Sequence, residues 1–466
     1  MRRSLVLSIS LLIIVGCARP GRDTPPPKAG GEPVPEVNGG LEHGAARDKF
    51  TANLTVEAMA RGEGFYSEEH DDFAGVSEVD ALEAKIYLKS FMAGADAAIG
   101  SDSSKLAFSR ACEHGKRIVI GAVGDVLLHQ PLAEQGMRRK DFATLWSGVA
   151  EELKLPNLMY ANLEGPTAGP LTASGKVISD PGYFDRVAYT SYPQFNYNPA
   201  LVSDLRDSGV DVVSTANNHA MDRRSLGADR TIEALKKAGL PFAGTRTSAE
   251  AARVSAEKTD WTVVTEKDGF KIGWVSCTFS TNGIPDPKRQ VLLCFGQRSI
   301  VLDQIRRLKA DPSIDAVIVT PHWGVEYTHT PGADQKALAK DMIEAGALIV
   351  FGDHPHVLQP VDRIEASDGH EGYVIYSLGN FVSGQKGVDK RTSAMIFVGL
   401  TKNQNGEVFV NGARHLPLAM MYGANGLSVK PAKGNFEEGR VLANRVLSRS
   451  VEIEPGAPIV TNPGCR

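Results

Sequence analysis

Short apolar runs alternate with amphipathic stretches between residues 116 and 425. Apolar and β-branched runs that are bounded by small or polar residues are typical of buried strands. We expect strands at Arg117–Asp125, Leu158–Asn162, Val210–Ser214, Thr262–Val264, Ile272–Ser276, Ala316–Thr320, Ala347–Phe351 and Tyr373–Ser377. Helical periodicity lies between several of them, at Asp141–Lys154, Pro199–Asp207, Ser225–Lys237, Gln304–Lys309 and Asp334–Ala345. This alternation predicts a layered α/β domain over residues 116–425.

The N-terminus has the pattern of an export signal. A basic pair, Arg2-Arg3, precedes the apolar run Leu5–Val15, which is too short to span a bilayer. Cys17 follows Gly16, an arrangement that resembles the bacterial lipoprotein lipobox. We therefore expect a signal peptide over residues 1–16, lipidation of Cys17, and a cell-envelope lipoprotein on the periplasmic or extracellular side of a membrane. An ordinary signal peptide with an incidental cysteine is the alternative, and it also exports the protein.

The remaining segments differ from the central domain in composition. Residues 17–48 are rich in Pro and Gly, which predicts a disordered tether. Residues 49–115 carry helical periodicity and are expected to form a helical extension, and residues 426–466 are expected to form a tail that wraps the domain. The net charge of -4 offers no electrostatic argument for binding nucleic acid.

Five cysteines are present, and lipidation of Cys17 would leave four. An even number in an exported protein permits disulfides. We favour the pairs Cys277–Cys294 and Cys112–Cys465, with free buried thiols as the alternative. The spacings include no CxxC motif of the kind found in metal and redox sites.

Polar side chains follow the ends of several predicted strands. They are Asp125, Asn162 with Glu164, Asn217-Asn218-His219 with Asp222, His322, and Asp353-His354-Pro355-His356. Parallel strands would bring these side chains to the same edge of a sheet. In an extended chain His354 and His356 would share one face. Nitrogen and oxygen donors without sulfur suit Zn, Mn or Fe better than Ca, so the pattern predicts a site for one or two divalent metal ions.

Each polar cluster also has a purely structural interpretation. The Asn217–His219 segment could be a turn whose side chains cap the following helix. A Gly-Asp pair after a strand is commonly a turn, and His322 could be a hydrogen-bonded structural residue. The recurrence of such clusters at successive strand ends favours the metal site over these separate explanations.

The ordered motifs resemble those of the CapA family of capsule-biosynthesis, poly-γ-glutamate-associated proteins. The matching segments are Gly124-Asp125, Asn162-Leu163-Glu164, Ala216-Asn217-Asn218-His219, His322-Trp323-Gly324, His354-Pro355-His356-Val357-Leu358-Gln359 and Ser377-Leu378-Gly379-Asn380-Phe381. The resemblance covers roughly residues 117–418. It implies a four-layer α/β/β/α sandwich with a calcineurin-like metallophosphoesterase fold and a dinuclear metal centre.

The resemblance also implies roles for individual residues. The implied metal ligands are Asp125, Glu164 as the bridging carboxylate, Asn218, His322, His354 and His356. His219 matches the catalytic histidine, Asp222 could orient it, and Asn217 and Asn380 could orient substrate oxygens.

The chain departs from the metallophosphoesterase pattern at three positions. Leu127 occupies the histidine position of the Asp-x-His motif, and Ala220 replaces the aspartate that would follow His219. Asp353 stands where relatives often carry another histidine. These departures leave a one-metal site and chemistry other than phosphoester hydrolysis open.

Three functional hypotheses follow. The first is a membrane-anchored CapA-like protein of capsule or poly-γ-glutamate synthesis or export, with a metal-dependent hydrolase-type site that acts on an anionic extracellular polymer or its precursor. The second is an envelope metallophosphoesterase for a small or lipid-linked phosphate ester. The third is a non-catalytic polymer-binding scaffold for capsule-synthase membrane subunits.

Overall fold

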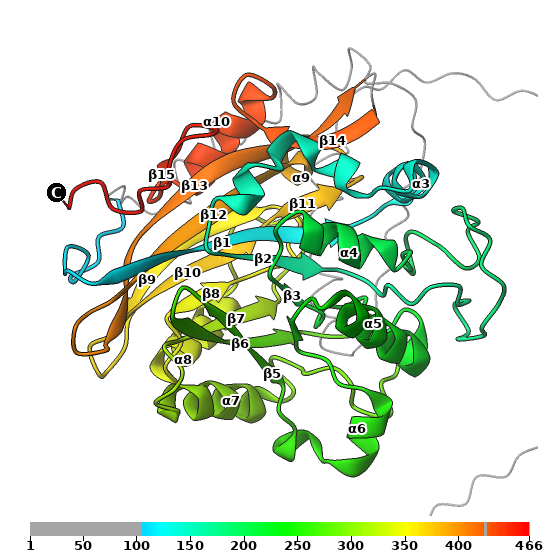
Figure 1. Ribbon diagram of the computed structural model, residues 1–466, viewed down its shortest axis with the longest axis horizontal. Coiled ribbons are helices and arrows are strands. Elements are labelled where there is room, and N and C mark those ends of the chain that lie inside the picture. The colour runs from blue at the N-terminus through cyan, green and yellow to red at the C-terminus, as the bar shows by residue number, and fades with distance from the viewer. Residues whose placement is uncertain (1–104, 424–425, 466) are drawn as a thin grey trace, which may run out of the picture. The chain divides into compact units, whose positions relative to one another are not determined.

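The computed structural model describes residues 105–423 and 426–465, and these form two β-sheets with helices outside them (Figure 1). The larger sheet runs in the order β14 (Gly426–Pro431), β13 (Val408–Gly423), β12 (Thr392–Lys402), β1 (Lys116–Leu127), β2 (Leu158–Leu163), β3 (Val212–Ser214) and β4 (Phe242–Ala243), with β11 (Asn380–Ser383) beside β1 and β15 (Val451–Glu452) beside β13. The smaller sheet runs in the order β5 (Thr262–Lys267), β6 (Phe270–Thr278), β7 (Ala316–His322), β8 (Ile349–Phe351), β10 (Glu371–Leu378) and β9 (Leu358–Glu365).

Helices cover the outer faces of both sheets. The α-helices are α3 (Gln130–Arg139), α4 (Ala200–Asp207), α5 (Arg224–Ala238), α6 (Ser248–Arg253), α7 (Arg298–Ala310), α8 (Ala333–Glu344), α9 (Val388–Arg391) and α10 (Glu437–Val446). Short 3-10 helices lie at η1 (Ala143–Leu145), η2 (Ser147–Val149), η3 (Glu152–Lys154) and η4 (Ala256–Lys258). One apolar core joins α3, α4 and α5 to the larger sheet, and another joins α7 and α8 to the smaller one.

A third core lies between the two sheets, and strand β1 shows how the sequence builds it. Ile118, Ile120 and Ala122 point into the inter-sheet core, whereas Val119 and Val123 face the helices on the other side. This alternation follows from the two-residue period of a strand, and it lets one strand bury both of its faces. The resulting order of layers is helix, sheet, sheet, helix, which confirms the predicted four-layer α/β/β/α sandwich.

Most of the elements predicted in the central domain are present. All eight predicted strands occur, with shifted ends, as do the helices α4, α5, α7 and α8. The continuous helix predicted over residues 141–154 is wrong, because that segment forms the three separate turns η1, η2 and η3. Gly148 lies in the middle of it, where a Cβ atom would come within 2.6 Å of the Val429 carbonyl oxygen. The backbone at Gly148 lies so close to β14 that the side chains of a continuous helix would not fit between them.

The ends of the chain are described only in part. The predicted signal peptide, Cys17, the tether and the helical extension up to residue 104 lie outside the described residues. Beyond residue 425, β14 pairs with β13 and β15 also pairs with β13, so strands of the predicted tail belong to the larger sheet. No helix in the described ranges is long and apolar enough to cross a membrane.

Both predicted disulfides are present. Cys277 at the end of β6 is bonded to Cys294, and Cys112, before β1, is bonded to Cys465. The first bond closes a short loop beside the end of β6, and the second links the two ends of the described chain.

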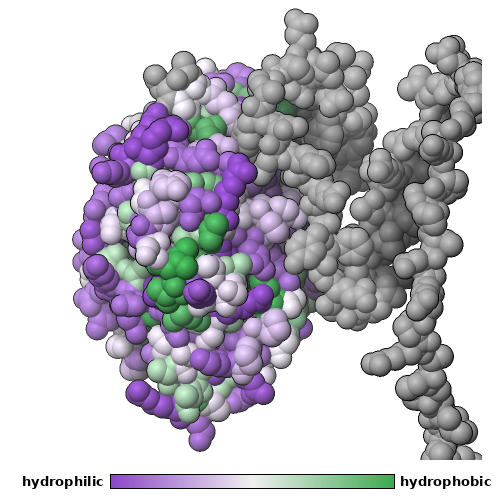
Figure 2. Space-filling view, turned by 90° about the vertical axis from the view of Figure 1, so that its right-hand side faces the viewer, coloured by the Kyte–Doolittle hydropathy of each residue, from purple (hydrophilic) through white to green (hydrophobic). Residues whose placement is uncertain are grey.

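The loop between β2 and α4 lies at the right-hand side of Figure 1. Four of its larger apolar side chains are exposed: Val177, Tyr183, Val187 and Tyr192. Figure 2 shows the molecule from that side, where polar residues dominate and apolar residues gather in a small patch.

Candidate metal centre

The side chain of Glu164 is the centre of the candidate site. It follows β2 directly, it is fully buried, and neither of its carboxylate oxygens has a hydrogen-bond partner. Nε2 of His322 lies 3.5 Å from Oε1 of Glu164, and Nε2 of His356 lies 3.9 Å from the same oxygen. A buried carboxylate without donors is costly unless a cation compensates it.

Asp125, at the end of β1, lies next to Glu164 and accepts hydrogen bonds from two side chains. Its Oδ1 accepts from the amide of Asn162 at 2.7 Å, and its Oδ2 lies 3.0 Å from Nδ1 of His356. The preceding residue, Gly124, permits this position, since a Cβ atom there would lie 1.8 Å from the Gly379 carbonyl oxygen. The amide of Asp125 donates to that same oxygen.

Two groups of ligand atoms share Glu164. One contains Asp125, Glu164 and His322, and the other contains Glu164, His354 and His356; within each group the donor atoms lie within 4.8 Å of one another. Asn218 joins the first group, with its Oδ1 2.9 Å from Nε2 of His322. All six predicted ligands are therefore brought together, and Glu164 is common to both groups, while its role as a bridging ligand stays a prediction.

The two sheets contribute different parts of this cluster. Strands β1, β2 and β3 are mutually parallel in the larger sheet, whereas β6, β7, β8 and β10 are parallel in the smaller one. The expectation of one shared sheet edge is therefore too simple. The ligands meet where the carboxyl ends of strands from two stacked sheets face each other.

His354 and His356 lie in a turn after β8, so the prediction that they alternate along an extended chain is wrong. Both have positive φ angles, 100° for His354 and 58° for His356. Positive φ is strained for side chains of this size and persists only where the surroundings hold it. The turn nevertheless directs both imidazoles to the cluster.

The buried charges shift the pKa values of these groups in opposite directions. Burial opposes the charged form of His356, but Glu164 and Asp125 outweigh it and raise its pKa to about 10. Burial likewise opposes ionisation of Asp125, yet His356 and His322 hold its pKa below the usual value. Burial and the charges of His322 and His356 lower the pKa of His354 well below 6.5, which keeps its imidazole neutral. A neutral imidazole is the form that binds metal, so His354 is already in that form, whereas His356 would release a proton when metal binds.

His219 and Asp222 form a hydrogen-bonded pair beside the ligand cluster. Nδ1 of His219 lies 2.8 Å from Oδ2 of Asp222, which also accepts the backbone N–H of Phe195 at 2.7 Å. The Phe195 ring packs edge-on against the His219 imidazole, with 4.8 Å between ring centroids. Burial lowers the pKa of His219, but the charge and hydrogen bond of Asp222 outweigh it, so the net shift is upward. The pair therefore has the arrangement of an oriented proton donor.

The two asparagines predicted to orient substrate have different surroundings. The amide nitrogen of Asn217 donates to the Leu163 carbonyl, and its Oδ1 is buried without a partner. Both polar atoms of the Asn380 side chain form hydrogen bonds with His356. Oδ1 lies 3.1 Å from Nδ1 of His356, and the amide nitrogen donates to the His356 carbonyl. Asn380 thus holds His356 in place, and the substrate roles of both residues remain predictions.

The residues present fit a divalent metal ion. Buried oxygen or nitrogen atoms without a hydrogen-bond partner include those of Asn162, Glu164, Asn217, Asp353 and His354. This group of donors contains only oxygen and nitrogen, which suits the Zn, Mn or Fe expected from the sequence. Leu127 contributes nothing to it, because its side chain is buried in the apolar core between the larger sheet and its helices.

The model of the family described as bacterial capsule synthesis protein PGA_cap matches residues 119–385, more than half of the chain. The chain belongs to this family. Every predicted metal, catalytic and substrate residue lies within the part that matches the PGA_cap model, whereas Cys17 lies outside it.

Curated relatives agree with membership of the PGA_cap family. The capsule biosynthesis protein CapA of Bacillus anthracis is 32% identical over 329 residues, which cover 70% of this chain and 72% of that protein. The PGA biosynthesis protein CapA of Bacillus subtilis (strain 168) is 32% identical over 212 residues, which cover 45% of this chain and 52% of that protein. Among solved structures, NAD nucleotidase of Haemophilus influenzae aligns with a TM-score of 0.39 and 11% identity over 74% of this chain and 65% of that chain.

Two residues at the site were not assigned a role from the sequence. Asn162 lies between Asp125 and His322. Its amide nitrogen is 2.7 Å from Oδ1 of Asp125 and 3.1 Å from Nδ1 of His322. The Asn-Leu-Glu motif is a signal for Asn162, although the family resemblance implies a ligand role only for Glu164. Phe195 gave no signal, because it lies 27 residues from Asp222 in a loop of irregular structure.

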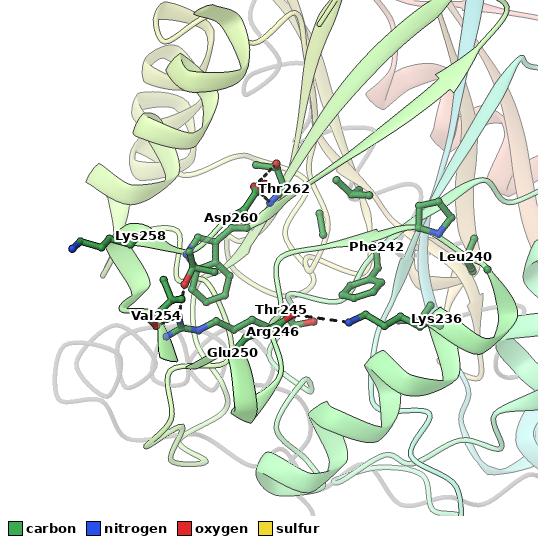
Figure 3. Close-up of a pocket in the computed structure, with 17 residues that line it drawn as sticks. Lys236, Leu240, Phe242, Thr245, Arg246, Glu250, Val254, Lys258, Asp260 and Thr262 are labelled. Atoms are coloured by element: carbon green, nitrogen blue, oxygen red, sulfur yellow. Dashed lines mark hydrogen bonds and ion pairs between the residues drawn. The ribbon is translucent and has the colours of Figure 1, made fainter. Parts of the chain in front are cut away.

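A separate cleft of about 530 Å³ lies between the end of α5, β4 and the start of β5 (Figure 3). Phe242 and Leu240 give it an apolar lining, and Lys236 and Arg246 lie around it. The Arg246 guanidinium lies over the Trp261 ring and donates to the Val254 carbonyl. None of the predicted site residues lines this cleft, so it is distinct from the candidate metal centre.

Proposed function

We propose that this protein is a metal-dependent hydrolase of capsule or poly-γ-glutamate synthesis or export that acts on an anionic extracellular polymer or its precursor. One observation carries the proposal. Glu164 is fully buried, has no hydrogen-bond donor, and is shared by two groups of metal-ligand atoms beside the His219–Asp222 pair. The names of the Bacillus relatives, which refer to capsule and PGA biosynthesis, support the choice of pathway.

Each group of residues has a distinct role in this proposal. Asp125, Glu164, Asn218, His322, His354 and His356 hold one or two divalent metal ions. Bound metal would lower the pKa of a water molecule and polarise a phosphate or carbonyl oxygen. His219 donates a proton to the leaving group from Nε2, because its Nδ1 is engaged by Asp222. Phe195 shields this pair on one side and fixes Asp222 through its backbone N–H.

The test is hydrolysis by the purified full-length chain, loaded in turn with Mn, Zn or Fe. Substrates are an aryl phosphate and poly-γ-glutamate. We expect at least one substrate to be cleaved in a metal-dependent manner. His219→Asn should lower kcat by about 100-fold or more, the usual size of a lost proton donor, while its metal content stays that of the wild type.

The possible results separate the hypotheses. Cleavage of the aryl phosphate alone would favour an envelope phosphoesterase over a polymer hydrolase. A protein that binds metal and poly-γ-glutamate but cleaves neither substrate would favour the scaffold. Full activity in His219→Asn would contradict the role of this histidine.

A further inference from the structure

Tyr327 is an exposed aromatic residue beside the metal ligands that has no role in the function proposed above. It lies in the loop after β7 and is 38% exposed. Its ring centroid lies 6.1 Å from that of His356, and the two rings are tilted by 33°. Tyr327 therefore connects a buried ligand of the candidate metal centre with the surface of the protein.

The backbone of Tyr327 is held in a strained conformation. Its φ angle is 62°, in the left-handed region that residues with large side chains rarely adopt. Its N–H donates to the Pro355 carbonyl at 2.8 Å, which ties it to the turn that carries His354 and His356. Because the side chain is only partly buried, packing does not account for the strain. Strained residues of this kind cluster at active sites and ligand clamps.

A chain of hydrogen bonds fixes the hydroxyl end of the Tyr327 side chain. The amide nitrogen of Gln385, a buried residue, donates to this hydroxyl at 3.2 Å. Oε1 of Gln385 accepts from the amide nitrogen of Asn380 at 3.0 Å, and Oδ1 of Asn380 lies 3.1 Å from Nδ1 of His356. The exposed ring is thus fixed relative to a ligand histidine through both its backbone and its hydroxyl, as a residue that contacts substrate requires.

A positive charge lies over the Tyr327 ring. Nζ of Lys390, in α9, is 4.8 Å from the ring centroid, the arrangement of a cation–π interaction. The Lys390 carbonyl accepts from the amide nitrogen of Asn380 at 3.0 Å, so the backbone of α9 belongs to the same network. A cation held at the edge of a metal centre attracts an anionic substrate to it.

We propose that Tyr327 and Lys390 form a binding subsite for an anionic group of the substrate, next to the group that reacts at the metal centre. This inference rests on the proposed function, which gives the protein an anionic polymer as its substrate. Every unit of poly-γ-glutamate carries a carboxylate, so the unit beside the reacting bond supplies the anion that Lys390 binds. The subsite favours a polymer with repeated carboxylates over a small ester with a single anionic group.

The test is titration calorimetry of poly-γ-glutamate binding to the full-length chain loaded with Zn²⁺. All proteins carry His219→Asn, so that cleavage does not interfere with the measurement. We expect Lys390→Gln to weaken binding about 10-fold, because a hydrogen bond between an ammonium and a carboxylate is lost. Lys154→Gln, the matched control, removes the same charge from an exposed side chain before β2 and should stay within about threefold of the His219→Asn protein.

A second variant tests the aromatic ring. Tyr327→Leu removes the ring beneath the ammonium but keeps an apolar side chain, and we expect it to weaken binding about fivefold. Elemental analysis should find the same zinc content in both variants as in the His219→Asn protein. A purely structural role would instead lower the zinc content, since Tyr327 contacts His356. Lys390→Gln alters only a partly exposed side chain, so it decides the outcome if Tyr327→Leu does not fold.

The outcomes separate this inference from the proposed function. A His219→Asn protein that binds no zinc, or binds zinc but not poly-γ-glutamate, would overturn the proposed function and the subsite with it. A His219→Asn protein that binds both, with an unchanged dissociation constant for the polymer in Lys390→Gln or a loss of zinc in the variants, would overturn only the subsite.

Discussion

Two buried histidines, His356 and His415, have opposite shifts in pKa because their neighbours differ. His356 faces Glu164 and Asp125, whose negative charges raise its pKa to about 10. His415 in β13 is buried against α10, where its Nε2 lies 3.0 Å from Oδ1 of Asn444. Burial outweighs the favourable effects of Asn444 and Glu452 and lowers the pKa of His415 to about 4. Burial therefore lowers the pKa of a histidine unless the charges of neighbouring carboxylates outweigh it, as Glu164 and Asp125 do at His356 and Glu452 does not at His415.

The shift at His415 predicts a loss of stability in mild acid. Between the folded pKa of His415, about 4, and the ordinary histidine value of 6.5, the unfolded chain binds a proton that the folded chain does not, so stability falls as pH falls through this window. At pH 5 the loss from this residue is about 2 kcal/mol. His415→Gln does not titrate, and it should lose about 2 kcal/mol less than the wild type between pH 7 and pH 5. Urea unfolding of the metal-free proteins at both pH values measures this difference.

The interpretation of His415 would be wrong if both proteins lost the same free energy of unfolding between these pH values. The metal-free state is needed because the histidines of the candidate site also titrate. They are present in both proteins, so their contribution cancels in the comparison.

The sequence predicted the identity of the site residues better than their geometry. Glu164 and His322 follow predicted strands, so their residue types and positions were enough to place them at a sheet edge. The orientation of His354 and His356 could not be predicted, because it depends on positive φ angles held by the tertiary structure. The role of Phe195 became apparent only from its contact with Asp222, which lies in a distant segment of the chain.

At the scale of secondary structure, local pattern predicted the buried parallel strands and failed elsewhere. Strands such as β7 are continuous apolar runs because both of their faces are covered. The antiparallel strands β12 and β13 were missed, although they pair along most of their length. The short strand β11 was also missed, because its pairing with β1 depends on a sharp turn at Gly379, whose φ is 68°.

The disulfide at the end of β6 shows how an element supports the site. Cys277 is followed closely by Phe279, whose ring centroid lies 4.3 Å from that of His354. The bond to Cys294 constrains the segment that carries this aromatic ring. A residue pairing chosen from parity and export alone is therefore part of the structure around the candidate metal centre.

At the scale of the whole molecule, two stacked sheets form one site. Asp125, Glu164 and Asn218 come from the larger sheet and its loops, and the three ligand histidines come from the smaller sheet and its loops. Such a site depends on packing between the sheets, which sequence patterns within single strands do not encode. The predicted layers were confirmed because alternation and chain order constrain them strongly.

We also propose that the protein is anchored to a membrane through lipid on Cys17, which would keep the proposed hydrolase close to the cell envelope. Cells that express the full chain should incorporate a labelled fatty acid into it. Cys17→Ser should abolish this labelling and release the protein from the membrane fraction. The variant Cys277→Ser, which changes a disulfide cysteine, serves as the control and should keep its label. Labelling that persists in Cys17→Ser would refute the anchor.

The central claim is that Glu164 joins two groups of ligands into one metal centre. Its most direct test is the number of metal ions bound per chain, measured by elemental analysis after dialysis against Mn²⁺ or Zn²⁺. We expect wild type to retain metal, and Glu164→Gln, of nearly equal size, to lose at least half of it, because both groups share this carboxylate. A wild type without bound metal, or a Glu164→Gln variant with the full wild-type content, would contradict the claim.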